Sequence, residues 1–173
     1  MVAATVVLFL LTIALNELLF ARAEFARGIS WIYLPAGVRL LCILLFAEAG
    51  GIGLLIASWW ICFFYFFPDQ PLRSFVGGIL AAAAPYLVYR LMLVGAGART
   101  SLADLTPWAL LGYAVAFSVA SPLLHHIWFA LQGQTENLFS GFFVMAAGDL
   151  SGTLIVLYLA KGVLALVGAR VPR

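Results

Sequence analysis

The chain has 173 residues, of which 65% are hydrophobic and only 9% are charged, a composition that excludes an ordinary soluble domain. Its mean hydropathy of +1.13 instead predicts an all-α fold, a polytopic transmembrane helical bundle formed by one integral membrane domain over residues 1–173. The net charge of +2 is scattered without a basic run, which excludes a nucleic-acid partner. We therefore expect the lipid bilayer as the main partner and a multi-pass location in the bacterial inner membrane.

The apolar stretches predict about six spans, since about 20 residues cross a hydrocarbon core of about 30 Å. Residues 2–20 form the first span. It lacks the basic leader and the cleavage signal of a signal peptide, so we expect it to be retained as a membrane helix. Residues 21–28 form a polar break at the membrane surface. Residues 30–67 are long enough for two short spans if residues 47–51 make the turn between them. The aromatic cluster over residues 59–67 indicates an anchor near one interface, and we assign it to no site.

The second half of the chain contributes three further spans. Residues 74–94 form the fourth, with Pro85 inside it. Ser101 and Asp104 resemble a capping box that opens a long helix over residues 105–131. Residues 138–167 form the last apolar stretch, in which small and polar residues at 147–152 break the apolar pattern. Some of these helices are short or broken, and broken pieces are tolerated where they face protein or water.

A fixed charge inside an apolar span makes Arg39 the first candidate site residue. A central arginine costs roughly 2.5 to 3.5 kcal/mol on insertion scales, so it should face protein, water or a ligand. Pro35 removes a backbone donor near the helix start, and Gly37 allows another backbone to approach. Two interpretations stay open: Arg39 binds a ligand, or it locks two helices together or reaches an interface.

A carboxylate at membrane depth is the second candidate. Asp149 follows Gly148 in the last apolar stretch and needs a cation or hydrogen-bond donors there. Arg39 is the only arginine comparably deep in a span, so we expect the two to pair across the bundle. The predicted ligand-binding or intramembrane polar site therefore comprises Arg39, Asp149, Pro35, Gly37 and Gly148.

The histidines and cysteines indicate no metal, cofactor or catalytic site. His125 and His126 are adjacent, so on a regular helix they point about 100° apart and cannot share one ion. They are expected at an interface or in hydrogen bonds. Cys42 and Cys62 lie in apolar segments, where buried thiols are expected. No nucleophile and base or paired carboxylates stand out, so we expect no enzyme.

Three segments in order resemble the MASE1 family of bacterial integral membrane sensor domains: residues 31–41 (WIYLPAGVRLL), 101–104 (SLAD) and 148–154 (GDLSGTL). The resemblance covers residues 30–173. It departs from the family pattern at Leu34, which replaces a proline, and in the proline missing soon after Asp149. Such domains usually precede kinase or cyclase domains. None follows Arg173, so the resemblance implies a sensor standing alone.

Two function classes follow. In the first, the chain is a sensory or regulatory module that binds a small ligand or partner helices and relays its state to a separate membrane or signalling protein. In the second, it is a small-molecule transporter or the substrate-binding component of an uptake system. Intramembrane Arg39 and Asp149 fit either class, and the sequence names no ligand, signal or partner.

Overall fold

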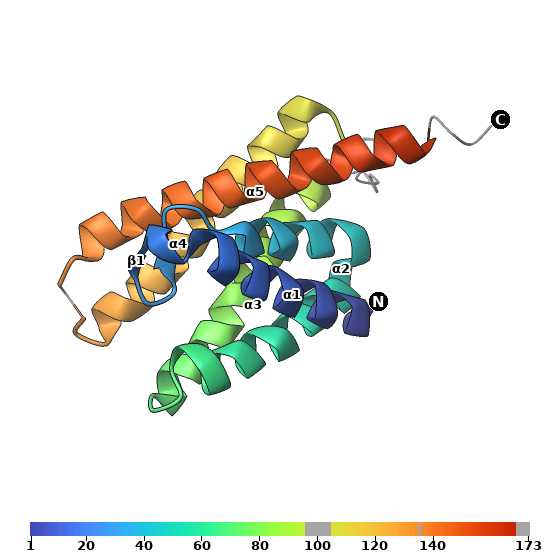
Figure 1. Cartoon of the computed structure of the whole chain (residues 1–173). Helices are drawn as coiled ribbons and strands as arrows, with labels where there is room; N and C mark the ends of the chain where they lie inside the picture. Colours follow the sequence, from blue (N-terminus) through green and yellow to red (C-terminus); the bar gives the residue numbers. More distant parts are fainter. Residues whose placement is uncertain (96–104, 135, 169–173) are drawn as a thin grey trace.

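The computed structural model describes residues 1–95, 105–134 and 136–168 and is almost entirely helical (Figure 1). Five long helices are α1 (Val2–Phe20), α2 (Leu34–Ile61), α3 (Pro71–Gly95), α4 (Pro107–Leu131) and α5 (Leu138–Gly168). Each contains a stretch that is long and apolar enough to cross a membrane. The predicted all-α fold is thereby confirmed.

The polar break after α1 folds into a small hairpin, where only a surface loop was expected. A 3-10 turn, η1 (Ala21–Ala23), leads into strands β1 (Glu24–Ala26) and β2 (Ile29–Ser30), which pair antiparallel. Gly28 supplies the positive φ of 81° that the tight turn needs. The hairpin lies beside the first half of α5, with Ile29 near Gly141 and Ser30 against Gly148, at one end of the bundle (Figure 1).

Helix α2 doubles back on itself within the predicted turn at residues 47–51. Ala47 has φ 46° and ψ −119°, outside the helical region, and the two parts of α2 run in different directions (Figure 1). A Cβ on Gly50 would collide with the carbonyl oxygen of Cys42. Residues eight apart in a straight helix lie about 12 Å apart, so this contact requires a chain reversal.

The first part of α2 runs along most of α1 in the opposite direction. Near the end of α1, the side chain of Asn16 accepts a 2.9 Å hydrogen bond from the backbone nitrogen of Leu34. Near its start, Thr5 and the carbonyl of Val2 lie against Gly53, which follows the reversal. The reversal therefore lies level with the start of α1. After Ile61, the π-helical turn η2 (Cys62–Phe66) leads to α3.

Helices α4 and α5 complete the bundle. The capping box expected at Ser101 and Asp104 lies outside the described residues, and Thr106 is the residue that caps α4, accepting a 3.1 Å hydrogen bond from the backbone of Ala109. Helix α5 continues without a break through residues 147–152, although their composition interrupts the apolar sequence. It packs mainly against α2 and α4.

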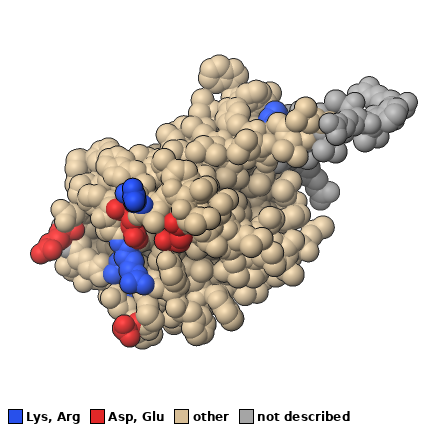
Figure 2. Space-filling model, in the orientation of Figure 1, with Lys and Arg blue, Asp and Glu red and all other residues tan. Residues whose placement is uncertain are grey.

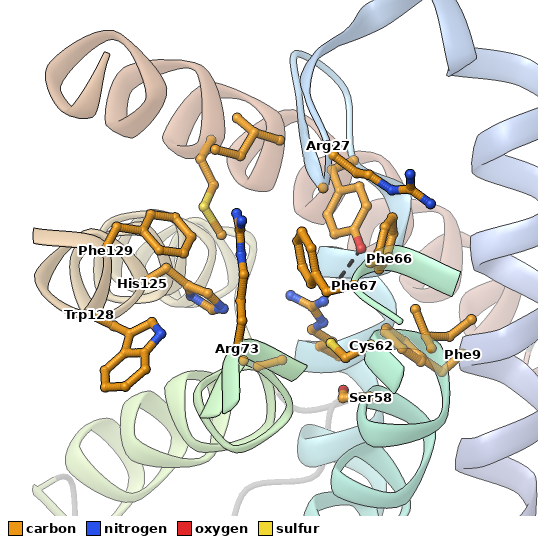
Figure 3. A pocket seen from close by; sticks show the side chains of 18 residues that line it. Phe9, Arg27, Ser58, Cys62, Phe66, Phe67, Arg73, His125, Trp128 and Phe129 are labelled. Atoms are coloured by element: carbon orange, nitrogen blue, oxygen red, sulfur yellow. Dashed lines mark hydrogen bonds between the residues drawn. The ribbon is translucent and has the colours of Figure 1, made fainter. Parts of the chain in front are cut away.

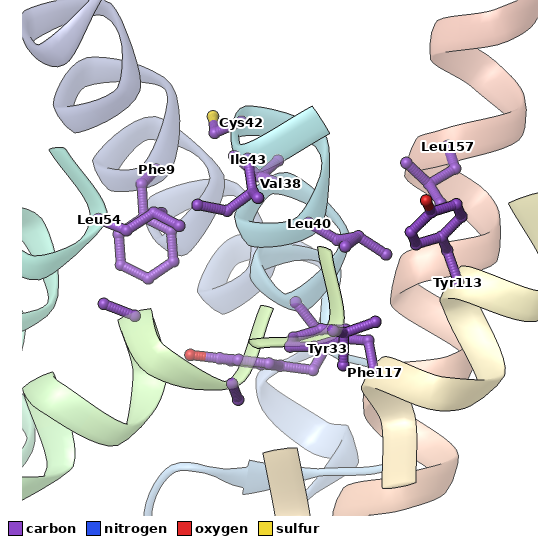
Figure 4. Packing of buried hydrophobic residues seen from close by; sticks show 14 of the residues in the cluster. Phe9, Tyr33, Val38, Leu40, Cys42, Ile43, Leu54, Tyr113, Phe117 and Leu157 are labelled. Carbon is purple, nitrogen blue, oxygen red and sulfur yellow. The ribbon is translucent and has the colours of Figure 1, made fainter. Parts of the chain in front are cut away.

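The apolar core joins all five long helices. Leu40, Ile43 and Leu54 of α2 are fully buried and pack with Phe9 of α1, and toward α4 and α5 the core continues through the buried side chains of Tyr113, Phe117 and Leu157 (Figure 4). The outside of the bundle is also apolar: 33 large hydrophobic side chains, such as those of Leu18 and Leu91, are exposed. In Figure 2, most charged side chains lie at the end that carries β1. An apolar flank with charges at its end suits a bilayer.

Candidate functional site

Arg39 lies in the middle of the bundle and is 7% exposed. Its guanidinium lies over the rings of Phe9 and Tyr33, at 5.2 and 5.4 Å from their centroids. Its hydrogen bond is a long one, 3.5 Å from Nη2 to the Tyr33 hydroxyl, drawn as a dashed line in Figure 3. Guanidinium stays charged at every physiological pH, so this position carries a permanent positive charge in an apolar environment.

Tyr33 lies just before α2 and is buried. This burial raises the pKa of Tyr33 to about 12, with Arg39 lowering the pKa and Asp149 raising it further. The phenol therefore stays protonated and neutral at physiological pH.

A second guanidinium approaches the same space from the start of α3. Arg73 stands between Phe67 and Phe129, with its guanidinium carbon 4.0 and 5.3 Å from the two ring centroids (Figure 3). Its Nη1 donates a 3.2 Å hydrogen bond to the side-chain oxygen of Gln70. Cation–π contacts of this kind hold a charged group in place without neutralising it.

A third arginine, Arg27, belongs to the hairpin and lies at the mouth of the site. It is exposed, lies 6.0 Å above the ring of Tyr65, and donates a 2.6 Å hydrogen bond to the Tyr65 carbonyl oxygen. Thus the hydrogen bonds of Arg27, Arg39 and Arg73 within the described structure go to a carbonyl, a phenol and an amide, none of which carries a negative charge.

These three arginines line a cavity of about 60 Å³ inside the bundle. Its wall also includes Phe66, Phe67, Ser58, His125, Trp128 and Phe129 (Figure 3), and none of its described lining residues is acidic. A hollow of about 380 Å³ continues it outward to the loop before α3, sharing Arg27, Ile29, Phe66, Phe67 and Arg73. The outer hollow includes one carboxylate, that of Asp69.

Three buried polar atoms on the inner cavity have no hydrogen-bond partner: Arg39 Nε, Arg73 Nε and Ser58 Oγ. Each of the two Nε atoms is a donor, and a buried donor left unpaired costs roughly 1 to 3 kcal/mol, more when it is charged. A bound group with acceptor oxygens would satisfy them. The cavity therefore combines fixed positive charge, unpaired donors and aromatic walls.

His125 adds a ring nitrogen to the cavity. Its Nδ1 lies 2.8 Å from the carbonyl oxygen of Ser121, one turn earlier on α4, and His126 makes the same contact with Pro122. A carbonyl only accepts, so Nδ1 carries the hydrogen and Nε2 of the neutral ring is an acceptor. Both histidines are hydrogen-bonded, as expected from the sequence. No cluster of three or more His, Cys, Asp or Glu side chains occurs among the described residues.

Asp149 is 1% exposed, and neither of its carboxylate oxygens has a hydrogen-bond partner. Arg39 instead contacts Tyr33, so the direct pairing of Arg39 with Asp149 stays a prediction. The free cysteines Cys42 and Cys62 are buried and partly buried, respectively.

The other predicted site residues pack helices together. A Cβ on Gly37 would lie 2.6 Å from the carbonyl oxygen of Gly152, and a Cβ on Gly148 would collide with the carbonyl oxygen of Ser30. Pro35 is fully buried at the start of α2. Of the five predicted residues, only Arg39 lines the cavity.

Sequence analysis missed most of the cavity wall. The aromatic cluster was assigned to a membrane interface, yet Phe66 and Phe67 line the cavity. Arg73 was unassigned although it follows Phe67 by only six residues, across a turn marked by Pro68 and Pro71. An arginine just beyond an aromatic cluster and a tight turn was the available signal. Trp128 and His125 were a weaker signal that α4 contributes to the cavity wall.

Comparisons of the chain with known protein families, with curated proteins and with solved structures found no match. The resemblance to MASE1 therefore rests on the three short segments alone.

Proposed function

We propose that this chain is a membrane-embedded module that binds a small organic anion in the cavity between Arg39 and Arg73. The observation that carries the proposal is the pair of buried, unpaired Nε donors on a cavity whose described lining has no acidic residue. An anionic group would supply acceptors and compensate two charges held in low dielectric, where an uncompensated charge costs several kcal/mol. Guanidinium groups suit carboxylates and phosphates especially well.

The size of the two spaces favours a ligand with a charged head and an apolar body. The inner cavity of about 60 Å³ has room for a carboxylate-sized group, whereas the outer hollow of about 380 Å³ has room for a ring. The aromatic side chains of Phe66 and Phe67, which line both spaces, would contact that body. Ligand sites are commonly apolar clefts with a few polar groups that fix orientation.

The proposed setting is the bacterial inner membrane, with six crossings. The reversal at Ala47 divides α2 into two parts, and the first part runs beside α1 from Asn16 to the level of Thr5. At 1.5 Å per residue its 13 residues before Ala47 extend about 20 Å, so this crossing is short. A short, broken helix is tolerated in a membrane where its irregular backbone packs against protein, and Gly50, just after the reversal, is buried against Cys42.

Two roles remain for an anion-binding membrane module. The resemblance to MASE1 supports a sensory or regulatory role, in which occupancy is relayed to a separate protein. The buried carboxylate of Asp149 supports the second role, uptake, because intramembrane carboxylates often serve coupling ions. Accumulation of a bound anion inside vesicles that contain only this chain would support uptake, and binding without accumulation would support the sensor.

Binding can be tested with phenylacetate and its neutral analogue phenylacetamide. The readout is the fluorescence of the purified chain in lipid nanodiscs, because Trp128 lines the cavity; Trp128→Phe identifies its contribution. We expect phenylacetate, and not phenylacetamide, to change the emission. Equal binding of the two compounds, or binding of neither, would contradict the proposal.

The matched variants are Arg73→Gln and Arg90→Gln, which make the same change on one helix. Arg73 lines the cavity, whereas Arg90 is exposed and lies outside it. Hydrogen bonds to a charged group contribute about 1.5 to 3 kcal/mol, so Arg73→Gln should weaken phenylacetate binding about 10- to 150-fold. Arg90→Gln should leave it unchanged.

A further inference from the structure

A second group of unpartnered buried atoms lies between α4 and α5, outside the cavity wall. It consists of both oxygens of Asp149, the hydroxyl of Thr153 one turn later on α5, and the hydroxyl of Ser121 on α4. Asp149, Thr153 and Ser121 are 1%, 0% and 0% exposed. The cavity holds unpaired donors, while this cluster presents unpaired oxygens.

A carboxylate in this position must be neutralised. It accepts no hydrogen bond, and burying an ionised carboxylate without donors is so costly that such groups usually take up a proton. The charged and titratable groups on the elements packed around it are Arg39, Cys42 and Glu48 of α2, Tyr33 before α2, and Tyr113, His125 and His126 of α4. Only Arg39 carries a permanent charge. On β1, the exposed Glu24 accepts a hydrogen bond from Gly28.

The cluster is linked to the cavity through two of these neighbours. Ser121 contributes its hydroxyl to the cluster, and its carbonyl contacts the ring of His125, a residue of the cavity wall one helical turn further on. Arg39 lines the cavity and donates to the Tyr33 hydroxyl, and the backbone nitrogen of Tyr33 donates a 3.2 Å hydrogen bond to the carbonyl oxygen of Gly148, the residue before Asp149. One turn of helix is 5.4 Å, so the two sites are near neighbours.

We propose that Asp149, with the hydroxyls of Ser121 and Thr153, is a proton-binding site, and that a proton binds there together with the anion in the cavity. The coupling follows from charge balance. Without a ligand, Arg39 is the fixed cation that offsets the Asp149 carboxylate. When an anion occupies Arg39, that compensation is lost, and a proton from water adds to one Asp149 oxygen to give the neutral acid, whose O–H donates to Ser121 or Thr153.

A proton fits the cluster better than Na⁺. A metal ion would bring a further positive charge close to Arg39, whereas a proton removes the negative charge without adding a centre that needs several ligands. The proton site stands on the cluster itself. Its coupling to an anion rests on the proposed function.

Infrared spectroscopy of the full chain in lipid nanodiscs tests the proton site without any ligand. Acidification should produce the carbonyl stretch of a protonated carboxylic acid, which Asp149→Asn removes. The matched control, Glu48→Gln, changes an exposed carboxylate and should keep the band. Thr153→Val removes one hydroxyl at nearly constant volume and should shift the band. A band unaffected by both Asp149→Asn and Thr153→Val, or removed by Na⁺ at constant pH, would overturn the proposal.

Phenylacetate binding at several pH values tests the coupling. If one proton binds with the anion, the dissociation constant of the wild type should rise about tenfold per pH unit above the pH range in which Asp149 titrates. In Asp149→Asn it should stay constant near the low-pH value. The same slope in both proteins would assign the proton to another group and overturn the coupling. Failure of phenylacetate to bind either protein would contradict the proposed function, while the infrared band still decides the proton site.

Discussion

Replacing Gly148 by alanine tests the tightest helix contact in the fold. A Cβ there would collide with the carbonyl oxygen of Ser30, which belongs to the backbone of β2 and cannot rotate away like a side chain. Gly162, also on α5, has no atom within 4 Å of an added Cβ. The two alanine variants share the gain in helix propensity, about 1 kcal/mol, so their difference isolates the collision.

The expected difference is the cost of overpacking, about 1 to 3 kcal/mol. For a chain of this length, each kcal/mol changes the melting temperature by about 2 to 4 °C, which gives a difference of about 2 to 12 °C between the variants. The assay is thermal unfolding of the purified protein in detergent, followed by tryptophan fluorescence. If Gly148→Ala melts together with Gly162→Ala, α5 does not lie this close to β2.

Three further predictions concern the reversal, the α1 contact and the central charges. Ala47→Gly should raise thermal stability by about 1 kcal/mol because glycine adopts φ 46° without strain; a lower melting temperature would argue against the reversal. Asn16→Ala should cost about 1 to 3 kcal/mol in thermal stability, since it leaves the buried nitrogen of Leu34 unpaired, and an unchanged melting curve would show that the bond contributes nothing. The double variant Arg39→Leu with Asp149→Leu should remain folded, as replaced buried charge pairs often do, yet lose phenylacetate binding; retained binding would remove Arg39 from the site.

Much of the fold could be predicted from the sequence because helix length and hydropathy are local properties. The apolar stretches correspond to the five long helices, and the two spans expected within residues 30–67 fall in the single helix α2, whose reversal lies in the glycine-rich segment at residues 47–51. The hairpin was missed because its strands have only three and two residues, too short for a periodic pattern. The continuity of α5 through Gly148 and Gly152 depends on its close fit against residues 30–37, which composition does not reveal.

The site was harder to predict because it is assembled from separate elements. Arg39 and Asp149 could each be identified from the sequence, because a charged residue within an apolar span is conspicuous. Arg73, by contrast, lies in the first turn of α3, and the sequence analysis assigned it to no site. Its role depends on Phe67 and Phe129, which come from different elements and meet only in the folded bundle.

The central claim is that an anion occupies the cavity between Arg39 and Arg73. Its most direct test is anomalous diffraction from crystals soaked in 4-bromophenylacetate, with the neutral 4-bromophenylacetamide as the matched control. The account predicts a bromine peak beside Phe66 and Phe67 for the acid, with its carboxylate toward the two guanidinium groups, and no such peak for the amide. A peak for both compounds, or bromine only outside the cavity, would contradict it.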